Sequence, residues 1–215
     1  MKLTKYEHSC VVLEVDGQSL VIDPGGLSQS FTAPENCIGV VVTHEHFDHL
    51  DQEKLQAVFA QNPEAILYTN SGVQSQLNES LAGRTRIINS GEEVTAGNFA
   101  LQFVGAQHEE IRQELPRPMN IGVVVNSLYF HPGDEFCVPE IDMQWLGLPI
   151  NAPWAKVKET NTYIKDVKAA HVLAIHDGLL NPAGLSTYEN HITAACEVVG
   201  SEYHYVRVGS TIELK

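Results

Sequence analysis

The sequence predicts an α/β protein built from packed layers of strands and helices. Short apolar runs rich in β-branched residues alternate with segments whose apolar residues recur at helical spacing. Two such series follow one another along the chain, each with strands first and helices after. Helices outside two packed sheets would form an α/β layered sandwich, although other α/β folds share this pattern. The length of 215 residues predicts a single domain over residues 1–215.

Turn and cap signals place the elements of the first half. Asp16 and Gly17 predict a two-residue hairpin turn, because both tolerate a positive φ angle. Asp51 is the expected N-cap of a helix that follows a buried strand. In this half we expect strands over residues 3–15, 19–23, 38–43 and 66–69, a helix after Asp51, and a second helix over residues 71–81.

The second half ends in the clearest helix of the chain. Ser186 and Glu189 predict a capping box at its start, and Gly200 predicts its end. The other expected elements are strands and hairpins over residues 84–106 and 121–130, a helix over residues 157–167, and strands over residues 172–175, 203–208 and 211–214.

The overall composition narrows the classes of partner and compartment. Thirteen basic and 27 acidic residues give a net charge of −14, which disfavours a nucleic-acid partner because such partners are held mainly by Lys and Arg. No apolar run reaches the ~20 residues of a membrane helix. The N-terminus is a poor signal peptide, so we expect a cytoplasmic protein. The four cysteines form no C-x-x-C pair and are expected to be reduced.

One segment concentrates metal-ligand residue types directly after a predicted buried strand. Residues 43–51 (THEHFDHLD) contain three histidines and three acids. His44 and His46 are two residues apart, so both side chains can point the same way from an extended strand end. Asp48 and His49 follow in the turn and could reach a second ion nearby. Histidine and carboxylate are ligands of zinc and related divalent metals. The segment therefore predicts a metal site.

This motif resembles the H-x-H-x-D-H signature of the metallo-β-lactamase superfamily, and the other landmarks of that family follow in order. Asp23 in VIDPG matches the acid at the end of an early strand, and His108 in GAQHEE matches the third histidine. Asp134 in HPGDE matches the acid that bridges two metals, and His176 in AIHDG matches the last histidine. The resemblance implies a four-layer αββα sandwich, with two mixed sheets flanked by helices and the metals at one edge.

The resemblance also implies a role for each of these residues. One metal ion would be held by His44, His46 and His108, the other by Asp48, His49 and His176, and Asp134 would bridge the two. Asp23 would orient a ligand histidine. Zinc is the first expectation for both ions, with manganese and iron(II) as alternatives. Asp48, Asp134 and His8 are the expected catalytic residues.

Within the superfamily the chain is most similar to a compact group related to L-ascorbate-6-phosphate lactonase. That group carries a G-H pattern in its first strand, and here Glu7 precedes His8. His8 is therefore expected at the mouth of the site, where it would support a ligand or contact the substrate. The Y-H-x-G-D pattern of the same group corresponds here to residues 129–134 (YFHPGD). In this segment His131 could act at the site or cap a strand end.

The remaining candidates have weaker signals. Arg112 and Arg117 lie just after His108 and could bind an anionic substrate, or they could belong to a solvated loop. For Asn151, Trp145 and Trp154 the alternatives are pocket wall and core, with core favoured. We expect ordinary surface or core positions for His171, His191 and His204.

Three functions fit these residues. The first is a hydrolase that uses a metal-bound hydroxide on a small-molecule ester, lactone or phosphoester. The second is a nuclease or phosphodiesterase related to tRNA 3′-processing enzymes, which the charge of −14 opposes. The third is a di-iron oxidoreductase or a binding protein without catalysis. Di-iron relatives usually carry a carboxylate in place of one loop histidine, and His46 therefore favours hydrolysis. The sequence does not indicate an oligomeric state.

Overall fold

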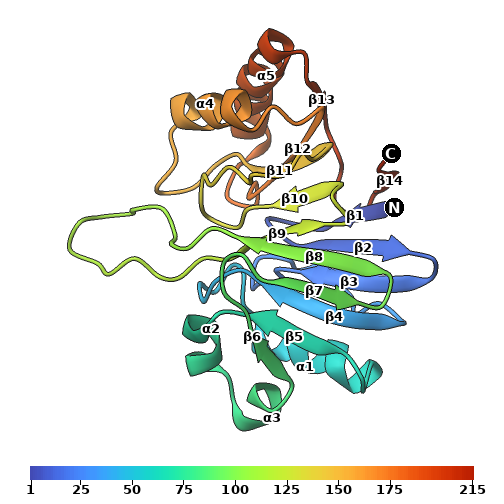
Figure 1. Ribbon diagram of the computed structural model, residues 1–215. Coiled ribbons are helices and arrows are strands. Elements are labelled where there is room, and N and C mark those ends of the chain that lie inside the picture. Colours follow the sequence, from blue (N-terminus) through green and yellow to red (C-terminus); the bar gives the residue numbers. More distant parts are fainter.

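Two seven-stranded sheets pack face to face in the computed structural model, which describes residues 1–215 (Figure 1). In spatial order, the first sheet contains β14 (Thr211–Glu213), β1 (Lys2–Lys5), β2 (Val11–Val15), β3 (Gln18–Ile22), β4 (Cys37–Val42), β5 (Ile66–Thr69) and β6 (Thr85–Ile87). The second contains β13 (Glu202–His204), β12 (His171–Ile175), β11 (Trp145–Pro149), β10 (Tyr129–His131), β9 (Gly122–Val125), β8 (Phe99–Val104) and β7 (Glu93–Ala96).

Both sheets are mixed in the same way. Strands β14, β1, β2 and β3 are antiparallel, and β3 to β6 are parallel. In the second sheet β7 to β10 are antiparallel, and β10 to β13 are parallel. The predicted αββα sandwich of two mixed sheets flanked by helices is thus confirmed.

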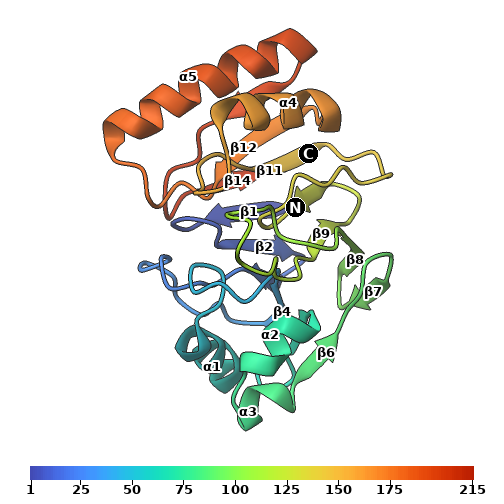
Figure 2. The ribbon, with the colours of Figure 1, turned by 90° about the vertical axis from the view of Figure 1, so that its left-hand side faces the viewer.

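Helices cover the outer face of each sheet. The first sheet packs against α1 (Gln52–Gln61), α2 (Ser71–Gln76) and α3 (Glu79–Ala82), and the second against α4 (Val157–Val167) and α5 (Pro182–Val199). Figure 2 shows these helices on opposite sides of the sheet pair. None of them has both the length and the apolar character that a membrane crossing requires.

Three apolar clusters hold these layers together. The largest lies between the sheets and draws on strands of both, with Leu13 and Leu20 from one and Phe103 and Leu173 from the other. Each of the other two lies between one sheet and its own helices. Removing this apolar surface from water at roughly 25 cal/mol per Å² is the main force that keeps the layers packed. The shared inter-sheet cluster agrees with a single domain over residues 1–215, which stays a prediction.

Several element boundaries differ from the predictions. The expected strand over residues 3–15 is two strands, because the chain turns at residues 6–10 and His8 takes a positive φ of 61°. The expected helix over residues 71–81 is divided, because Asn78 caps the start of α3. The last helix begins at Pro182 with Asn181 as its N-cap, so the predicted capping box at Ser186 and Glu189 is wrong.

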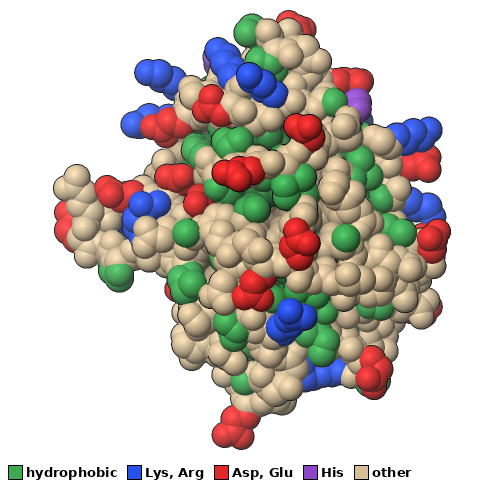
Figure 3. Space-filling model, in the orientation of Figure 1, with side chains coloured by type: hydrophobic (Ala, Val, Ile, Leu, Met, Phe, Trp, Pro, Cys, Tyr) green, Lys and Arg blue, Asp and Glu red, His purple; other side chains and the backbone are tan.

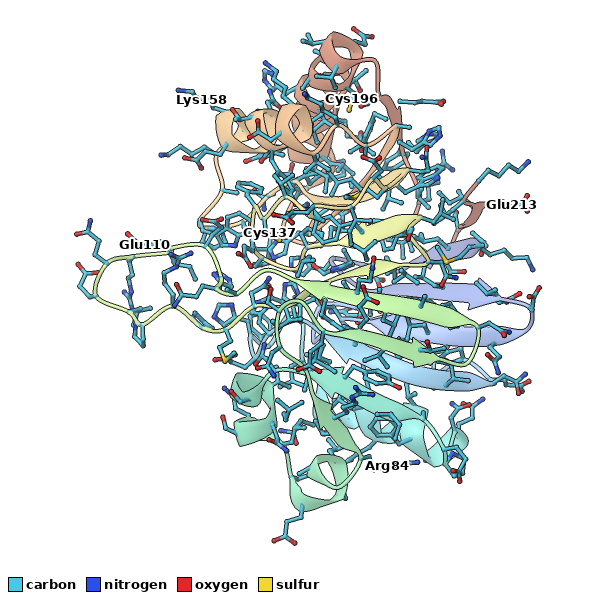
Figure 4. The ribbon with its side chains drawn as sticks, in the orientation of Figure 1. Arg84, Glu110, Cys137, Lys158, Cys196 and Glu213 are labelled. Carbon is cyan, nitrogen blue, oxygen red and sulfur yellow. The ribbon has the colours of Figure 1, made fainter.

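The fold brings the carboxyl ends of several strands to one edge. Strand β4 ends just before residues 43–51, β10 ends at His131, and β12 ends just before His176. At the same edge, β8 leads into a long loop over residues 105–121 that extends away from the body of the molecule (Figure 1). Figure 4 places Glu110 on the extended part of this loop.

Candidate metal centre

The residues that the motifs single out meet at this edge. They form three overlapping groups, and within each group the donor atoms all lie within 4.8 Å of one another. The groups are His44 with His46 and His108, His44 with His49 and Asp134, and His8 with Asp48, His49 and His176. Asp134 stands between the histidines, with its Oδ1 3.1 Å from His49 Nε2 and its Oδ2 3.1 Å from His176 Nε2. Its Oδ2 is also 3.3 Å from His108 Nε2. The structure therefore collects all seven expected ligands in one cluster.

Local turns shape the segment that carries four of these residues. The backbone N–H of His49 donates to the carbonyl of His46, which closes a tight turn after β4. The turn after β3 packs against it, and Gly26 N–H donates to the Phe47 carbonyl at 2.7 Å. Gly25 approaches so closely that a Cβ atom there would overlap the carbonyl of Asp48. A glycine is thus required at this position for the metal-binding segment to keep its shape.

Asp23 fixes the orientation of His49 from behind. It is fully buried, and its Oδ1 accepts the N–H of Thr43 at 2.8 Å. Its Oδ2 lies 2.7 Å from His49 Nδ1 and also accepts the hydroxyl of Thr43. A carboxylate can only accept here, so His49 carries a proton on Nδ1, and Nε2 is the nitrogen that it turns towards the cluster.

Two other histidines are oriented by backbone carbonyls. His108 Nδ1 lies 2.6 Å from the Glu109 carbonyl, and His176 Nδ1 lies next to the Asn151 carbonyl. Because a carbonyl oxygen can only accept a hydrogen bond, Nδ1 of each ring carries the proton, and Nε2 is left unprotonated in the neutral form. Backbone and carboxylate acceptors outside the cluster thus prepare the inner nitrogens for ligation.

Several donor atoms of the cluster are buried without a satisfactory hydrogen bond, as expected of atoms that ligate a metal. Four buried atoms of the cluster form no well-aligned hydrogen bond, although oxygens of Asp134 lie 3.1–3.3 Å from the three nitrogens; these atoms are His49 Nε2, His108 Nε2, His176 Nε2 and Asp134 Oδ1. Leaving one buried polar atom unpaired costs about 1–3 kcal/mol, so four unpaired atoms facing one space call for a common partner. Imidazole nitrogens and carboxylates are the donors that zinc and related divalent ions prefer. The residues present therefore fit a metal.

The electrostatics of the cluster agree with this fit. Burial alone would lower the pKa of His49, but the carboxylates of Asp134 and Asp23 raise it well above its usual range. Burial and the neighbouring histidines lower the pKa of His44 and of His46. The carboxylates thus favour positive charge in the middle of the cluster, while His44 and His46 are held neutral and able to ligate.

His8 lies behind Asp48 and not at the mouth of the site. It is fully buried, its Nδ1 accepts the N–H of Gly178 at 3.2 Å, and its Nε2 lies 2.9 Å from Asp48 Oδ2. Burial lowers the pKa of His8 to about 4, so the ring is neutral near pH 7. Because Nδ1 accepts, the proton is on Nε2 and is donated to Asp48. In this tautomer His8 cannot itself be a ligand, and it orients Asp48.

A cavity opens onto the cluster. Its volume is about 260 Å³, and it is lined by His46, Asp48, His108, Asp134 and His176 together with Leu27, Phe47, Ile111, Pro153, Trp154 and Leu179. Trp154 Nε1 donates to Asp134 Oδ2 at 2.8 Å, so the expectation of a core position is wrong for Trp154. It holds for Trp145, which is 4% exposed. The Nε1–H of a tryptophan needs an acceptor when buried, but the sequence does not show which one.

Neither arginine of the long loop lines this cavity. Arg117 Nε donates to the carbonyl of His108 at 2.7 Å and thereby holds the base of the loop. Arg112 is exposed. His131 is buried, with its Nε2 2.9 Å from the carbonyl of Ser9, and it also lies outside the cavity. The charged groups that face the cavity are the histidines and carboxylates of the cluster.

The fold and the cluster together define a class, that of metallo-β-lactamase-fold proteins with a histidine and aspartate metal centre. A family model described as a β-lactamase superfamily domain matches residues 2–176. Protein Rv0786c of Mycobacterium tuberculosis is 31% identical over 198 residues, which cover 90% of this chain and 92% of that protein. The chain belongs to the metallo-β-lactamase superfamily.

Solved structures show the same fold at low sequence identity. Igni18, a metallo hydrolase from the archaeon Ignicoccus hospitalis, superposes with a TM-score of 0.72 at 19% identity and covers 100% of this chain and 99% of its own. The isothiocyanate hydrolase from Delia radicum gut bacteria has a TM-score of 0.66 at 16% identity, with 100% and 99% covered. These likenesses concern the fold. The similarity to the L-ascorbate-6-phosphate lactonase group stays a prediction.

Proposed function

We propose that the chain is a dinuclear metal-dependent hydrolase. The observation that carries the proposal is the set of four buried, unpaired donor atoms that converge on one space at the cavity floor. Three of them are imidazole nitrogens whose protons are held on the outer side of the ring. Membership of the superfamily supports the same activity.

The donors divide into two sets around Asp134. His44, His46 and His108 would hold one ion, and Asp48, His49 and His176 would hold the other. Asp134 faces both sets through its two oxygens and is the proposed bridge. Zinc is the first choice, with manganese and iron(II) as alternatives. Two such ions, when bound, supply Lewis acidity and lower the pKa of water at the site.

The protein's own groups then set the geometry of the reaction. Trp154 donates to Asp134 Oδ2 and His8 donates to Asp48, so each carboxylate keeps one direction for its remaining lone pairs. Asp23 accepts a hydrogen bond from His49 Nδ1 and thereby fixes the orientation of that ring. Catalytic roles are proposed for Asp48 and Asp134, because both touch the reacting centre. His8 acts through Asp48 and is a positioning residue.

For the substrate we propose an uncharged ester or lactone with an apolar substituent. All six apolar side chains at the cavity are partly or largely exposed, and Phe47, Leu179 and Ile111 among them are 68%, 58% and 42% exposed. None of the residues that line the cavity is a lysine or an arginine. The sequence suggests an anionic substrate held by Arg112, but the cavity wall contains no lysine or arginine that could bind it. We therefore place neutral substrates first.

A metal experiment tests the centre. Purified protein is expected to carry about two divalent ions per chain, and His46→Ala is expected to lose at least one, because removing an imidazole leaves an incomplete ligand set. Ions are counted by elemental analysis after dialysis. Protein that holds no zinc, manganese or iron after reloading would contradict the proposal.

A substrate panel tests the class. The loaded protein is assayed on matched pairs of neutral and anionic esters and lactones, with phosphodiesters and an isothiocyanate alongside. We expect kcat/KM to rise with the apolar area of neutral substrates, and we expect Arg112→Ala to leave the ratio of neutral to anionic rates unchanged. A selective rise in KM for anionic substrates in Arg112→Ala would restore the anionic class.

A further inference from the structure

A second group of metal-ligand side chains lies away from the cavity, at the edge of the second sheet. It consists of His171 at the start of β12 and of Glu202 and His204 on the edge strand β13. His171 and His176 lie at opposite ends of β12, which separates the two by about 17 Å at ~3.3 Å per residue. This group is therefore distinct from the metal centre proposed above and does not depend on it.

Strand register brings the three side chains to one face. His171 pairs with Glu202, and Leu173 pairs with His204, in the parallel β12–β13 ladder (Figure 1). Side chains two apart on a strand share a face, so Glu202 and His204 both stand beside His171. Trp145 pairs with His171 on the next strand, and its ring lies 4.4 Å from that of His171 and 4.6 Å from that of His204.

This tryptophan makes a rigid floor for the two imidazoles. Trp145 is buried, and its Nε1 donates to the Lys215 carbonyl at 3.3 Å. The rings of His171 and His204 are consequently confined on one side by an indole that cannot turn away. Donors held in place before a ligand arrives lose little conformational entropy on binding.

The distances within the group match those around a zinc ion. His171 Nδ1 is 3.0 Å from His204 Nε2, and each of these nitrogens is 3.6 Å from Glu202 Oε2. Neighbouring ligands in a tetrahedral site with bonds of 2.0–2.1 Å are about 3.4 Å apart. The three observed separations lie on both sides of that value, so one ion fits between the donors.

A simple hydrogen bond between the two histidines does not explain the carboxylate. The pair at 3.0 Å could share one proton without any ion. Glu202 Oε2, however, stands equally far from both nitrogens, at a distance beyond that of a hydrogen bond. An exposed carboxylate aligned on the midpoint of two imidazoles is the arrangement expected of a third ligand.

We propose that His171, Glu202 and His204 form a separate binding site for one divalent ion of the zinc type. Two imidazoles with one carboxylate select zinc, copper or nickel over magnesium and calcium. The fourth position is open to solvent beside Glu202, which is 68% exposed at its side chain. The ion would fasten the edge strand β13 to β12, so its role is structural.

A zinc titration of the full chain tests this site while the cavity centre is kept saturated. Additional zinc is measured by competition with a chromophoric chelator. We expect the wild type to bind about one more ion per chain than His204→Ala. His191→Ala, which removes an exposed histidine of α5, is the matched control and is expected to bind as the wild type does. Equal stoichiometry in wild type and His204→Ala would overturn the proposal, as would an equal loss in His191→Ala.

A second measurement avoids any doubt about folding of the variants. Imidazole ¹H–¹⁵N spectra of the wild type are recorded as zinc is added to the centre-saturated protein. We expect the His171 and His204 resonances to shift together with the same zinc dependence, and we expect Glu202→Gln to weaken that dependence. Zinc-independent resonances of both rings would show a hydrogen-bonded pair and no site.

Discussion

At the scale of single residues, the backbone of His8 decides how Asp48 is held. The residue takes a positive φ of 61° between β1 and β2, and this turn places its ring behind the metal-binding segment. Its carbonyl also accepts the N–H of His176 at 2.9 Å, so the same residue anchors both sides of the centre. A strand through this position, as the apolar pattern predicts, would point the ring elsewhere.

We predict that His8→Ala lowers kcat by about 10–100-fold, a typical cost of removing a group that orients a metal ligand. KM is expected to change little, because His8 does not line the cavity. His8→Gln offers an N–H donor at a similar reach and is expected to restore part of kcat. Steady-state kinetics with circular dichroism as the folding control provide the measurement. A change in KM without a fall in kcat would refute the positioning role. So would a kcat of His8→Gln no higher than that of His8→Ala.

Asp134 provides the second prediction at this scale. Asp134→Ala is expected to remove turnover while the protein stays folded, because the carboxylate faces the cavity from a loop and the apolar clusters lie elsewhere. The far-ultraviolet circular dichroism spectrum and the rate on the best substrate are compared with those of the wild type. Near-normal turnover would show that Asp134 does not bridge the ions.

The sequence predicts much of the centre and little of its support. His44, His46, Asp48 and His49 lie in a segment whose residue types predict a metal site by themselves, whereas His108, Asp134 and His176 are singled out only by the resemblance to the superfamily. Trp154 and the Asn151 carbonyl are different, since their contacts with Asp134 and His176 arise from loops brought together only by the fold. No local pattern encodes such contacts. The group around His171 was missed for the same reason, because it depends on the β12–β13 register.

At the scale of elements, the N-cap of α1 shows local chemistry at work. Asp51 accepts the N–H groups of Glu53 and Lys54, and it pairs with the Lys54 ammonium at 3.0 Å. Burial alone would raise the pKa of Asp51, but these bonds lower it below its ordinary value of 3.8. A lowered carboxyl pKa stabilises the folded state above that value, and this contribution is lost as pH falls through the folded pKa.

We therefore predict that Asp51→Ala lowers the free energy of unfolding by about 1 kcal/mol at neutral pH. The difference from the wild type is expected to shrink as pH falls from about 5 towards about 3. Urea unfolding at a series of pH values measures it. Asp51→Asn keeps the accepting oxygen and is expected to lose less than Asp51→Ala. A difference that does not depend on pH would assign the effect to helix propensity.

Caps and turns also explain which elements the sequence predicts well. The hairpin at Asp16-Gly17 is confirmed, with positive φ at both residues, because the turn itself requires that chemistry. The start of α5 shows a signal that was misread, since Asn181 followed by Pro182 is an N-cap with proline in the first turn. Strand β11 was missed because its residues, WLGLP, have no alternation when both faces are buried.

At the scale of the molecule, the shared cluster between the sheets predicts cooperative unfolding. Trp145 and Trp154 both lie in the second half of the chain, so fluorescence follows that half, whereas circular dichroism follows both. With metal kept saturating, we expect the two signals to give coincident urea transitions. Separate midpoints would show that the sheets unfold as two units and would contradict a single domain over residues 1–215.

The surface carries its charge in a dispersed form. In the face that Figure 3 shows, acidic side chains are scattered over the body and along the extended loop, with basic ones between them. On this face, no single patch of acidic side chains accounts for the net charge of −14. This distribution is consistent with a small substrate, since a polyanionic partner would need a continuous basic face.

The order of the ligands along the chain has a consequence for biosynthesis. The segment with His44, His46, Asp48 and His49 leaves the ribosome first, long before Asp134 and His176 are translated. A nascent chain can offer an ion only part of the coordination, while each sheet packs against its own helices through an apolar cluster that contains none of the proposed ligands. We therefore expect metal loading to follow folding, unlike in zinc fingers, where the ion drives folding. If the centre acts as proposed, ions enter a finished scaffold, and metal availability would set the number of active copies more strongly than the number of folded ones.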